Sequence, residues 1–231
     1  TESLPSTDVY NLHWICGFID PLPFFQTVEQ PVVWTLHDMN PFTGGCHVNA
    51  GCRRYEEACG KCPQLGSNRE SDLSRSVWSR KRNAYRHALG EERLHIVAPS
   101  SWMSEEAQKS ALLADAKVHT IPHGLDHNNF CPRNTEGMRA ALGIPPDHRI
   151  VLFVAQSVRH HNKGFDLLAE ALGAFEQGNV TLLSIGRGDP DLETTLPNIH
   201  LGTIESDLLL SAFYSLADLF VIPSRQEAFG Q

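Results

Sequence analysis

Long apolar runs, an excess of basic residues and a leader-like start are all missing from this sequence. No run approaches the roughly 20 apolar residues that a membrane-spanning helix needs. Residues 1–8 contain neither a basic stretch nor an apolar one, so we expect no signal peptide and a cytoplasmic location. The 27 Asp and Glu residues outnumber the 19 Lys and Arg residues, which argues against nucleic acid as a partner.

Apolar, β-branched runs alternate with helix-like segments along most of the chain. We predict strands at residues 8–15, 31–36, 94–98, 117–121, 149–155, 180–185, 198–202 and 219–222. We predict helices at residues 76–87, 101–113, 135–142, 164–175 and 206–216. Strands that alternate with helices form parallel sheets, so the sequence predicts the α/β class with two Rossmann-like sheets. The last apolar run, 219–222, is expected to be a buried strand.

A change in local amino-acid composition divides the chain. Prolines at positions 122, 132, 145 and 146 punctuate a polar segment that is typical of an interdomain connection. We therefore place an N-terminal domain at residues 1–127, a linker at 128–147 and a C-terminal domain at 148–231. The chain begins without Met and stops soon after its last predicted strand. We expect both domains to be incomplete, the first without its opening strands and the second without its last part.

Three groups of residues follow predicted strands of the second half, where open α/β sheets bind ligands. The loop 156–164 leads into a helix and carries Arg159 and Lys163, so its amides and cations suit an anion. An ordinary solvated turn is the alternative. Gly186-Arg187-Gly188 would let a ligand approach the backbone closely. Glu227 can accept hydrogen bonds from hydroxyl groups, although an exposed carboxylate is the plainer interpretation.

The order and spacing of these motifs resemble those of retaining glycosyltransferases of family four, including bacterial members. The resemblance is carried in the second half by residues 163–168, 184–188, 217–224 and 227–230. In the first half it is carried by residues 35–38 and 121–126. It extends over nearly the whole chain and implies the two-domain GT-B fold, with both Rossmann-like domains incomplete here.

The resemblance assigns roles to individual residues. Lys163 matches the lysine that holds the donor diphosphate, and Glu227 matches the first of two glutamates that contact the donor. His37 matches a histidine that contacts the transferred sugar; without the resemblance it is equally a capping or core histidine. Gln156 stands where the family has an arginine, so Arg159 is considered as a substitute. The donor-binding set also includes Gly186, Arg187, Gly188 and Gly230.

The activity that the resemblance implies is transfer of a hexose from a UDP- or GDP-sugar, with retention, to a glycan or lipid-linked acceptor. Such activity belongs to polysaccharide biosynthesis and is expected to need no catalytic metal. A lipid-linked acceptor would bring peripheral contact with the inner face of the membrane. We expect this chain by itself to be weakly active or inactive, because the family's second glutamate and its N-terminal glycine-rich loop fall outside it.

Four cysteines fall within one long predicted loop, residues 39–74, which is similar to a cysteine-rich loop in some bacterial members of that family. Cys59 and Cys62 form a Cys-x2-Cys pair, and Cys46 and Cys52 precede them with wider spacing. Neighbouring thiols in a chain without a signal peptide suggest structural zinc, with disulfides and free thiols as alternatives. A zinc-braced, non-enzymatic interaction module is therefore one alternative function. A GT-B sugar epimerase or phosphorylase is the other.

Overall fold

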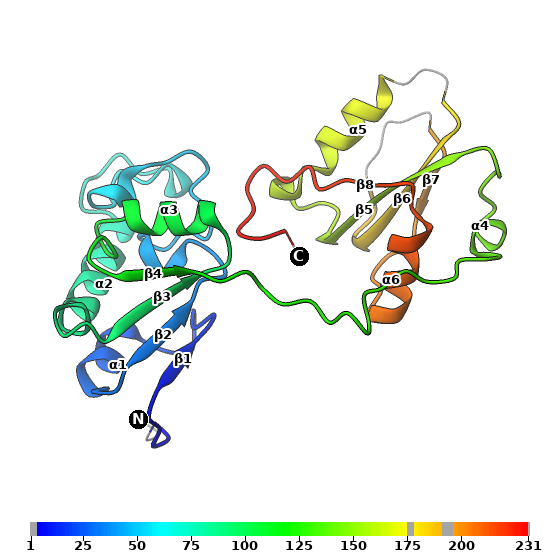
Figure 1. Cartoon of the computed structure of the whole chain (residues 1–231). Coiled ribbons are helices and arrows are strands. Elements are labelled where there is room, and N and C mark those ends of the chain that lie inside the picture. Colours follow the sequence, from blue (N-terminus) through cyan, green and yellow to red (C-terminus); the bar gives the residue numbers. More distant parts are fainter. Residues whose placement is uncertain (1–3, 175–177, 191–195, 231) are drawn as a thin grey trace. The chain divides into compact units, whose positions relative to one another are not determined.

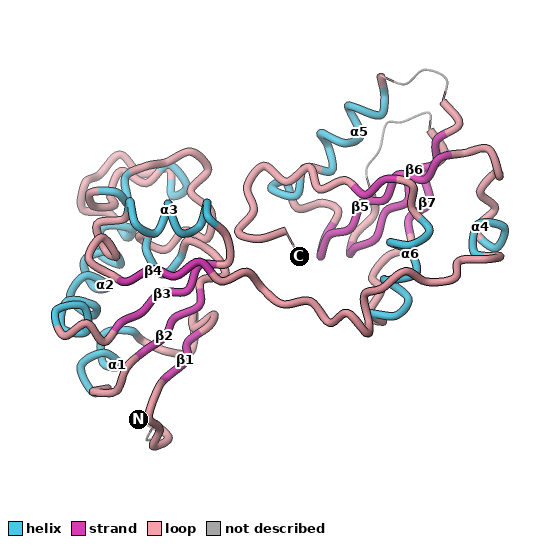
Figure 2. The backbone as a smooth tube through the Cα atoms, viewed as in Figure 1, coloured by secondary structure: helices cyan, strands magenta, loops and turns pink. Residues whose placement is uncertain are grey.

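The computed structural model describes residues 4–174, 178–190 and 196–230, which form two compact units (Figure 1). The first unit extends to His123, and the second runs from Gly124 to Gly230. Each contains a four-stranded sheet in which every strand pair is parallel (Figure 2). The predicted α/β class with two Rossmann-like sheets is confirmed. Phe175, the last residue of a predicted helix, lies outside the described residues. Gln231, the last residue of the predicted second domain, lies outside them as well.

The first unit has the strand order β1-β2-β3-β4. Its strands are β1 (Tyr10–Leu12), β2 (Val32–Thr35), β3 (Leu94–Ala98) and β4 (Lys117–Thr120). Its α-helices are α1 (Pro21–Thr27), α2 (Leu73–Gly90) and α3 (Ser101–Lys109). Short 3-10 helices at Asn40–Phe42, Arg54–Glu56 and Pro63–Leu65 interrupt the long connection between β2 and α2.

Aromatic side chains join the helices of the first unit to its sheet. Trp34 of β2 makes an edge contact with Tyr85 of α2, with ring centroids 5.8 Å apart. Phe25 of α1 contacts the same tyrosine at 5.4 Å. All three side chains are almost completely buried. Such aromatic contacts dominate the energetics of a core, so they fix α1 and α2 on this sheet.

The second unit has the strand order β7-β6-β5-β8. Its strands are β5 (Arg149–Ser157), β6 (Val180–Arg187), β7 (Asn198–His200) and β8 (Leu219–Phe220). Its helices are α4 (Met138–Ala141), α5 (Phe165–Gly173) and α6 (Asp207–Leu216), with a 3-10 turn at His161–Lys163.

Helices cover both faces of the second sheet. Ile150 and Leu152 of β5 are buried in one apolar cluster with Phe213 of α6. Val151 and its neighbours on the alternate positions of β5 are buried in another cluster, on the side of α5 (Figure 1). Successive side chains of a strand point to opposite faces, so the continuous apolar run of β5 is what a parallel strand covered on both sides requires.

Two features of the second unit differ from expectation. The strand predicted at 219–222 is not buried: Leu219 is 56% exposed and Phe220 is 36% exposed. The reason is that β8 stands at the sheet edge, where it pairs with β5 on one side. Residues 128–147 were predicted as a linker but belong to the second unit. Ile144 is buried in the core cluster of that unit, and the Arg133 backbone N–H donates to Ser215 Oγ at 3.0 Å.

None of the helices within the described ranges combines the length and the apolar character needed to cross a membrane. The longest α-helix of these ranges, α2, carries five Arg and Lys residues along its 18 positions. Its polar character agrees with the lack of long apolar runs in the sequence.

Candidate functional site

The structure brings Lys163 and Glu227 together at the carboxyl edge of the second sheet. Lys163 ends the turn that follows β5, and Glu227 lies in the segment that follows β8. The Lys163 Nζ donates to Glu227 Oε2 at 2.7 Å, and Ser224 Oγ donates to the same oxygen at 3.2 Å. The two charged side chains are 32% and 31% exposed, so both are accessible from solvent.

A network of polar contacts holds the loop of Lys163 against the segment of Glu227. The Arg225 backbone N–H donates to the Asn162 carbonyl at 2.8 Å, and Asn162 Nδ2 donates to the Gln226 carbonyl at 2.6 Å. The Arg225 guanidinium donates to both carboxylate oxygens of Asp166, at 2.9 and 2.6 Å. These hydrogen bonds lower the pKa of Asp166 to about 2. Arg225 was not predicted as a site residue, since its partner lies 59 residues earlier in the chain.

The start of α5 is a second feature of this edge that suits an anion. Gly164 adopts a left-handed conformation with φ of 70°, and α5 begins at Phe165 directly after it. Within the described part of the chain, no side chain caps this helix start. The amide groups at a helix N-terminus carry a partial positive charge and bind phosphate groups in many proteins. Together with the Lys163 ammonium, they form a site that can bind an anion.

The other residues predicted for donor binding lie around the turn that follows β6. Gly188 packs against the side chain of Arg159, whose Nε donates to the Asp189 carbonyl at 2.9 Å. Gly186 is needed for packing, because a Cβ there would lie 2.3 Å from the Ala155 carbonyl oxygen of β5. Arg187 is exposed at the end of β6.

Gly230, which also belongs to the predicted donor-binding set, lies in the segment that follows β8. A Cβ added at Gly230 would lie 3.7 Å from Glu227 Cγ, an ordinary contact distance, so this glycine lies beside the candidate carboxylate. The turn after β6 continues into an Asp-x-Asp pattern, Asp189-Pro190-Asp191, whose last residue falls outside the described part of the chain.

In the first unit, His37 belongs to a group of three histidines. His13, His37 and His123 follow β1, β2 and β4, whose carboxyl ends meet at one edge of the sheet. His13 Nδ1 and His37 Nε2 share a hydrogen bond of 3.0 Å, and the rings of His37 and His123 stack at 5.1 Å. Partial burial lowers the pKa of His37, and His123 and His13 lower it further. A neutral imidazole results, which can both donate and accept hydrogen bonds.

Sequence reasoning selected His37 but neither of its two neighbours. Each histidine follows a different strand, so only the parallel order of these strands reveals that the three side chains meet. The sequence signal that identifies such a group is a histidine just after each of three separate predicted strands.

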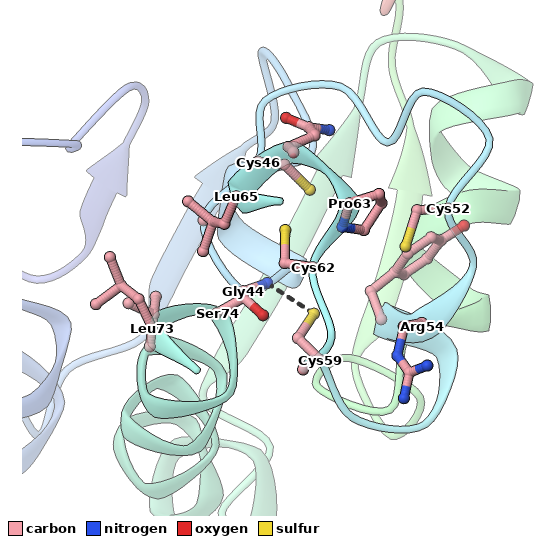
Figure 3. Close-up of a pocket in the computed structure, with 15 residues that line it drawn as sticks. Gly44, Cys46, Cys52, Arg54, Cys59, Cys62, Pro63, Leu65, Leu73 and Ser74 are labelled. Carbon is pink, nitrogen blue, oxygen red and sulfur yellow. Dashed lines mark hydrogen bonds between the residues drawn. The ribbon is translucent and has the colours of Figure 1, made fainter. Parts of the chain in front are cut away.

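The four predicted metal-ligating cysteines line one cavity in the connection between β2 and α2 (Figure 3). All six cysteines of the chain are free thiols. Within residues 4–174, 178–190 and 196–230, no group of three or more His, Cys, Asp or Glu side chains is already spaced to hold a metal ion. The structural zinc therefore stays a prediction at this point.

Residues 148–231 match a family model described as "Glycosyl transferases group 1". Among curated proteins, the putative colanic acid biosynthesis glycosyl transferase WcaC of Escherichia coli K12 is 26% identical over 210 residues, which are 87% of this chain and 48% of that protein. A glycogen synthase of Lactiplantibacillus plantarum is 34% identical over 107 residues, 42% of this chain and 22% of that protein. The chain thus spans half or less of the length of these relatives.

Solved structures show the same fold. The Anabaena protein Alr3699/HepE, in complex with UDP and glucose, superposes with a TM-score of 0.54 at 17% identity, covering 87% of this chain and 48% of that one. The catalytic domain of starch synthase IV from Arabidopsis thaliana, bound to ADP and acarbose, gives a TM-score of 0.57 at 15% identity, covering 97% and 53%. Together with the match of residues 148–231 to the family model and the curated relatives, these structures show that the chain has the GT-B fold and is similar to GT-B glycosyltransferases.

Proposed function

We propose that the second unit binds a nucleotide-diphosphate sugar and that the protein transfers its hexose, with retention, to a glycan or lipid-linked acceptor. The observation that carries this proposal is the Lys163–Glu227 pair at the carboxyl edge of a parallel sheet. Open α/β sheets bind their ligands at this edge. The pair also lies inside the region that matches the glycosyl transferase family.

Lys163 and the start of α5 would bind the diphosphate of the donor. When the bond to the sugar breaks, negative charge grows on the leaving phosphate, and preorganised cations and N–H groups stabilise that charge. Lys163 is already held by Glu227 and by the backbone geometry of its turn, so little ordering is lost when a phosphate arrives. Stabilisation of the leaving group is therefore the main catalytic contribution that we assign to this unit.

Glu227 would change partner when the donor binds. In the structure its carboxylate accepts hydrogen bonds from Lys163 and Ser224. Phosphate oxygens compete for the Lys163 ammonium, which leaves Glu227 oxygens available to hydroxyl groups of the sugar. Arg159, Gly186, Arg187, Gly188 and Gly230 are proposed as further donor contacts, and His37, a hydrogen-bonding imidazole of the first unit, as a contact of the transferred sugar.

Several finer points belong to the same proposal. UDP-sugars are favoured by the UDP, glucose and UDP-glucose bound in HepE, whereas starch synthase IV was solved with ADP. A role in bacterial polysaccharide synthesis is supported by the names of WcaC and of the glycogen synthases. We place the protein in the cytoplasm, with peripheral contact to the inner face of the membrane if the acceptor is lipid-linked. The matched family and relatives do not favour an epimerase, a phosphorylase or a non-enzymatic module.

Calorimetric titration of the chain with UDP, UDP-glucose and GDP-mannose tests the proposal. Lys163→Ala should weaken binding of the nucleotide by about tenfold or more, because it removes a charged hydrogen-bond donor to phosphate. Lys117→Ala is the matched control, since Lys117 forms an exposed ion pair with Glu92 at 2.5 Å in the first unit. If Lys163→Ala binds UDP as tightly as Lys117→Ala does, Lys163 has no phosphate role.

Glu227→Gln separates recognition of the sugar from recognition of the phosphate. UDP should bind this variant at least as tightly as the wild type, because the amide no longer competes for the Lys163 ammonium. UDP-glucose should lose whatever affinity it gains over UDP in the wild type. Equal loss for both ligands would show that Glu227 acts only by holding Lys163 in place.

A further inference from the structure

Four of the six cysteines surround a single cavity of about 300 Å³ in the first unit (Figure 3). They are Cys46, Cys52, Cys59 and Cys62. The rest of the wall is mainly apolar and includes Pro63, Leu65, Leu73 and Val77. The three segments that contribute the thiols belong to a connection with no α-helix or strand of its own. A connection this long is usually functional or held by a cross-link.

The backbone presents Cys59 and Cys62 to the cavity by a locked turn. Gly60 and Lys61, between the two cysteines, both have left-handed φ angles, 136° and 44°. A positive φ is costly for lysine, and the turn is fixed by a hydrogen bond from the Lys61 N–H to the Arg69 carbonyl at 2.9 Å. The Cys62 N–H donates to Asp72 Oδ2 at 2.8 Å. Free thiols at a surface would not need backbone geometry that is fixed in this way.

One backbone contact of Cys59 favours a sulfur that carries negative charge. The Gly44 N–H donates to Cys59 Sγ at 3.1 Å (Figure 3). A side chain at Gly44 would prevent this approach, because its Cβ would lie 2.9 Å from that sulfur and 2.5 Å from the Ser74 carbonyl oxygen. Hydrogen bonds to a sulfur from backbone amides favour its charged form over its neutral form.

Two cations accompany the thiols. Lys81 of α2 is 7% exposed and donates to Thr43 O at 3.2 Å and to Asn40 Oδ1 at 3.1 Å. Burial lowers its pKa to about 8, and Cys46 and Cys59 are among the groups that oppose this shift. Arg54 lines the cavity, and its Nε is buried without a hydrogen-bond partner in the described part of the protein. Cations beside a thiol cluster favour an anionic occupant.

We propose that Cys46, Cys52, Cys59 and Cys62 bind one structural zinc ion as thiolates. Four thiolates around Zn²⁺ carry a net charge of −2, which the neighbouring Lys81 and Arg54 offset in part, since Arg54 also pairs with Glu70 at 3.2 Å. The metal replaces the four thiol protons, which pass to solvent, and no oxidant is needed. The thiol side chains must rotate toward the centre of the cavity, because the described residues hold no ligand group at metal spacing.

The metal-free thiols have no evident chemistry of their own. Cys59 is buried, and Cys46, Cys52 and Cys62 are partly buried, which limits the access of oxidants and electrophiles to the thiols. A zinc ion in a closed, four-coordinate thiolate site is structural, since no coordination position is left for water.

Zinc at this place would brace the edge of the sheet that carries His37. Cys46 is followed by His47, whose Nδ1 lies 2.7 Å from Asp38 Oδ2, and the Met39 N–H donates to the His47 carbonyl at 3.0 Å. Asp38 follows His37 directly. The metal would thus fix the residues that flank the histidine.

Metal analysis of the purified chain tests the proposal. After expression in zinc-supplemented medium, elemental analysis should find about one zinc ion per chain in the wild type and in Cys131→Ser, whose thiol lies outside the cavity. Cys59→Ser and Cys62→Ser should lose that zinc. Because the loss of a zinc ligand can also prevent folding, the wild type is loaded with Co²⁺ as well, which should show the absorption of tetrahedral cobalt bound to thiolates.

Two results would overturn the proposal. One is wild-type protein that contains no zinc and gives no cobalt–thiolate absorption. The other is mass-spectrometric detection of two disulfides among the four cysteines in protein purified under reducing conditions. Binding of UDP-glucose is measured on the same samples, and its loss in Lys163→Ala with retained zinc would show that the metal and donor proposals are independent.

Discussion

Replacing Gly164 by alanine tests how tightly the loop of Lys163 packs against the segment of Glu227. Gly164 has a left-handed backbone with φ of 70°, directly after Lys163. A Cβ at this position would lie 2.0 Å from the Pro223 carbonyl oxygen and 2.8 Å from its carbon. These are backbone atoms, which cannot rotate away, so the segment that leads to Glu227 must move.

The expected loss of stability has two parts. A left-handed conformation costs a non-glycine residue about 1–2 kcal/mol. Overpacking adds about 1–3 kcal/mol, so Gly164→Ala should lower the free energy of unfolding of the second unit by about 2–5 kcal/mol in total. Gly143→Ala is the matched control, because Gly143 has φ of 67° and, among the described residues beyond its chain neighbours, no heavy atom lies within 4 Å of an added Cβ. It should show only the first part, about 1–2 kcal/mol.

The distribution of tryptophan gives the assay an internal reference. Trp14, Trp34, Trp78 and Trp102 all belong to the first unit. Tryptophan fluorescence during urea unfolding therefore reports that unit, and far-ultraviolet circular dichroism also reports the second. Gly164→Ala should shift the dichroism transition without shifting the fluorescence transition. If Gly164→Ala and Gly143→Ala lose the same stability, the close packing of Gly164 on Pro223 is refuted.

Two further predictions concern titrating groups of the first unit. His123→Ala should raise the pKa of His37 measured by NMR, because the second largest cause of its lowering is removed; an unchanged value would contradict the stacking of the two rings. Lys81 has a pKa of about 8 in the folded protein, compared with an ordinary value of 10.5. Between these pH values the unfolded chain binds more protons than the folded one. The free energy of unfolding should therefore rise with pH across this range. Lys81→Met should remove this rise in urea unfolding, and Lys117→Met should keep it.

The sequence predicted the strands well and one helix not at all. β3 was predicted with its observed bounds because its apolar, β-branched run is flanked by polar residues and a proline. Helix α1 was missed, since it has only seven residues and contains Pro21 and Pro23. Proline at the first helical position and an Asp20 cap that accepts from the Leu22 N–H make this short helix stable. Apolar character alone could not show that β8 is an exposed edge strand.

For the candidate site, the sequence named residues but not the contacts between them. Lys163 and Glu227 were selected through a family resemblance, and their ion pair is a result of the fold. Arg225 and its partner Asp166 are distant in sequence, so no local pattern connects them. Similarly, counting cysteines predicted a cluster, whereas the left-handed turn at Gly60 that aims two of them into one cavity is a property of the folded backbone.

The exposure of the Lys163–Glu227 pair decides how its variants are interpreted. An ion pair whose side chains are 32% and 31% exposed is partly screened by water and contributes about 0–1 kcal/mol to stability. Lys163→Ala should therefore unfold almost like the wild type, in contrast to Gly164→Ala one residue later. A variant that keeps its stability and loses affinity for UDP has lost a ligand contact, because a structural role would appear in the unfolding transition first.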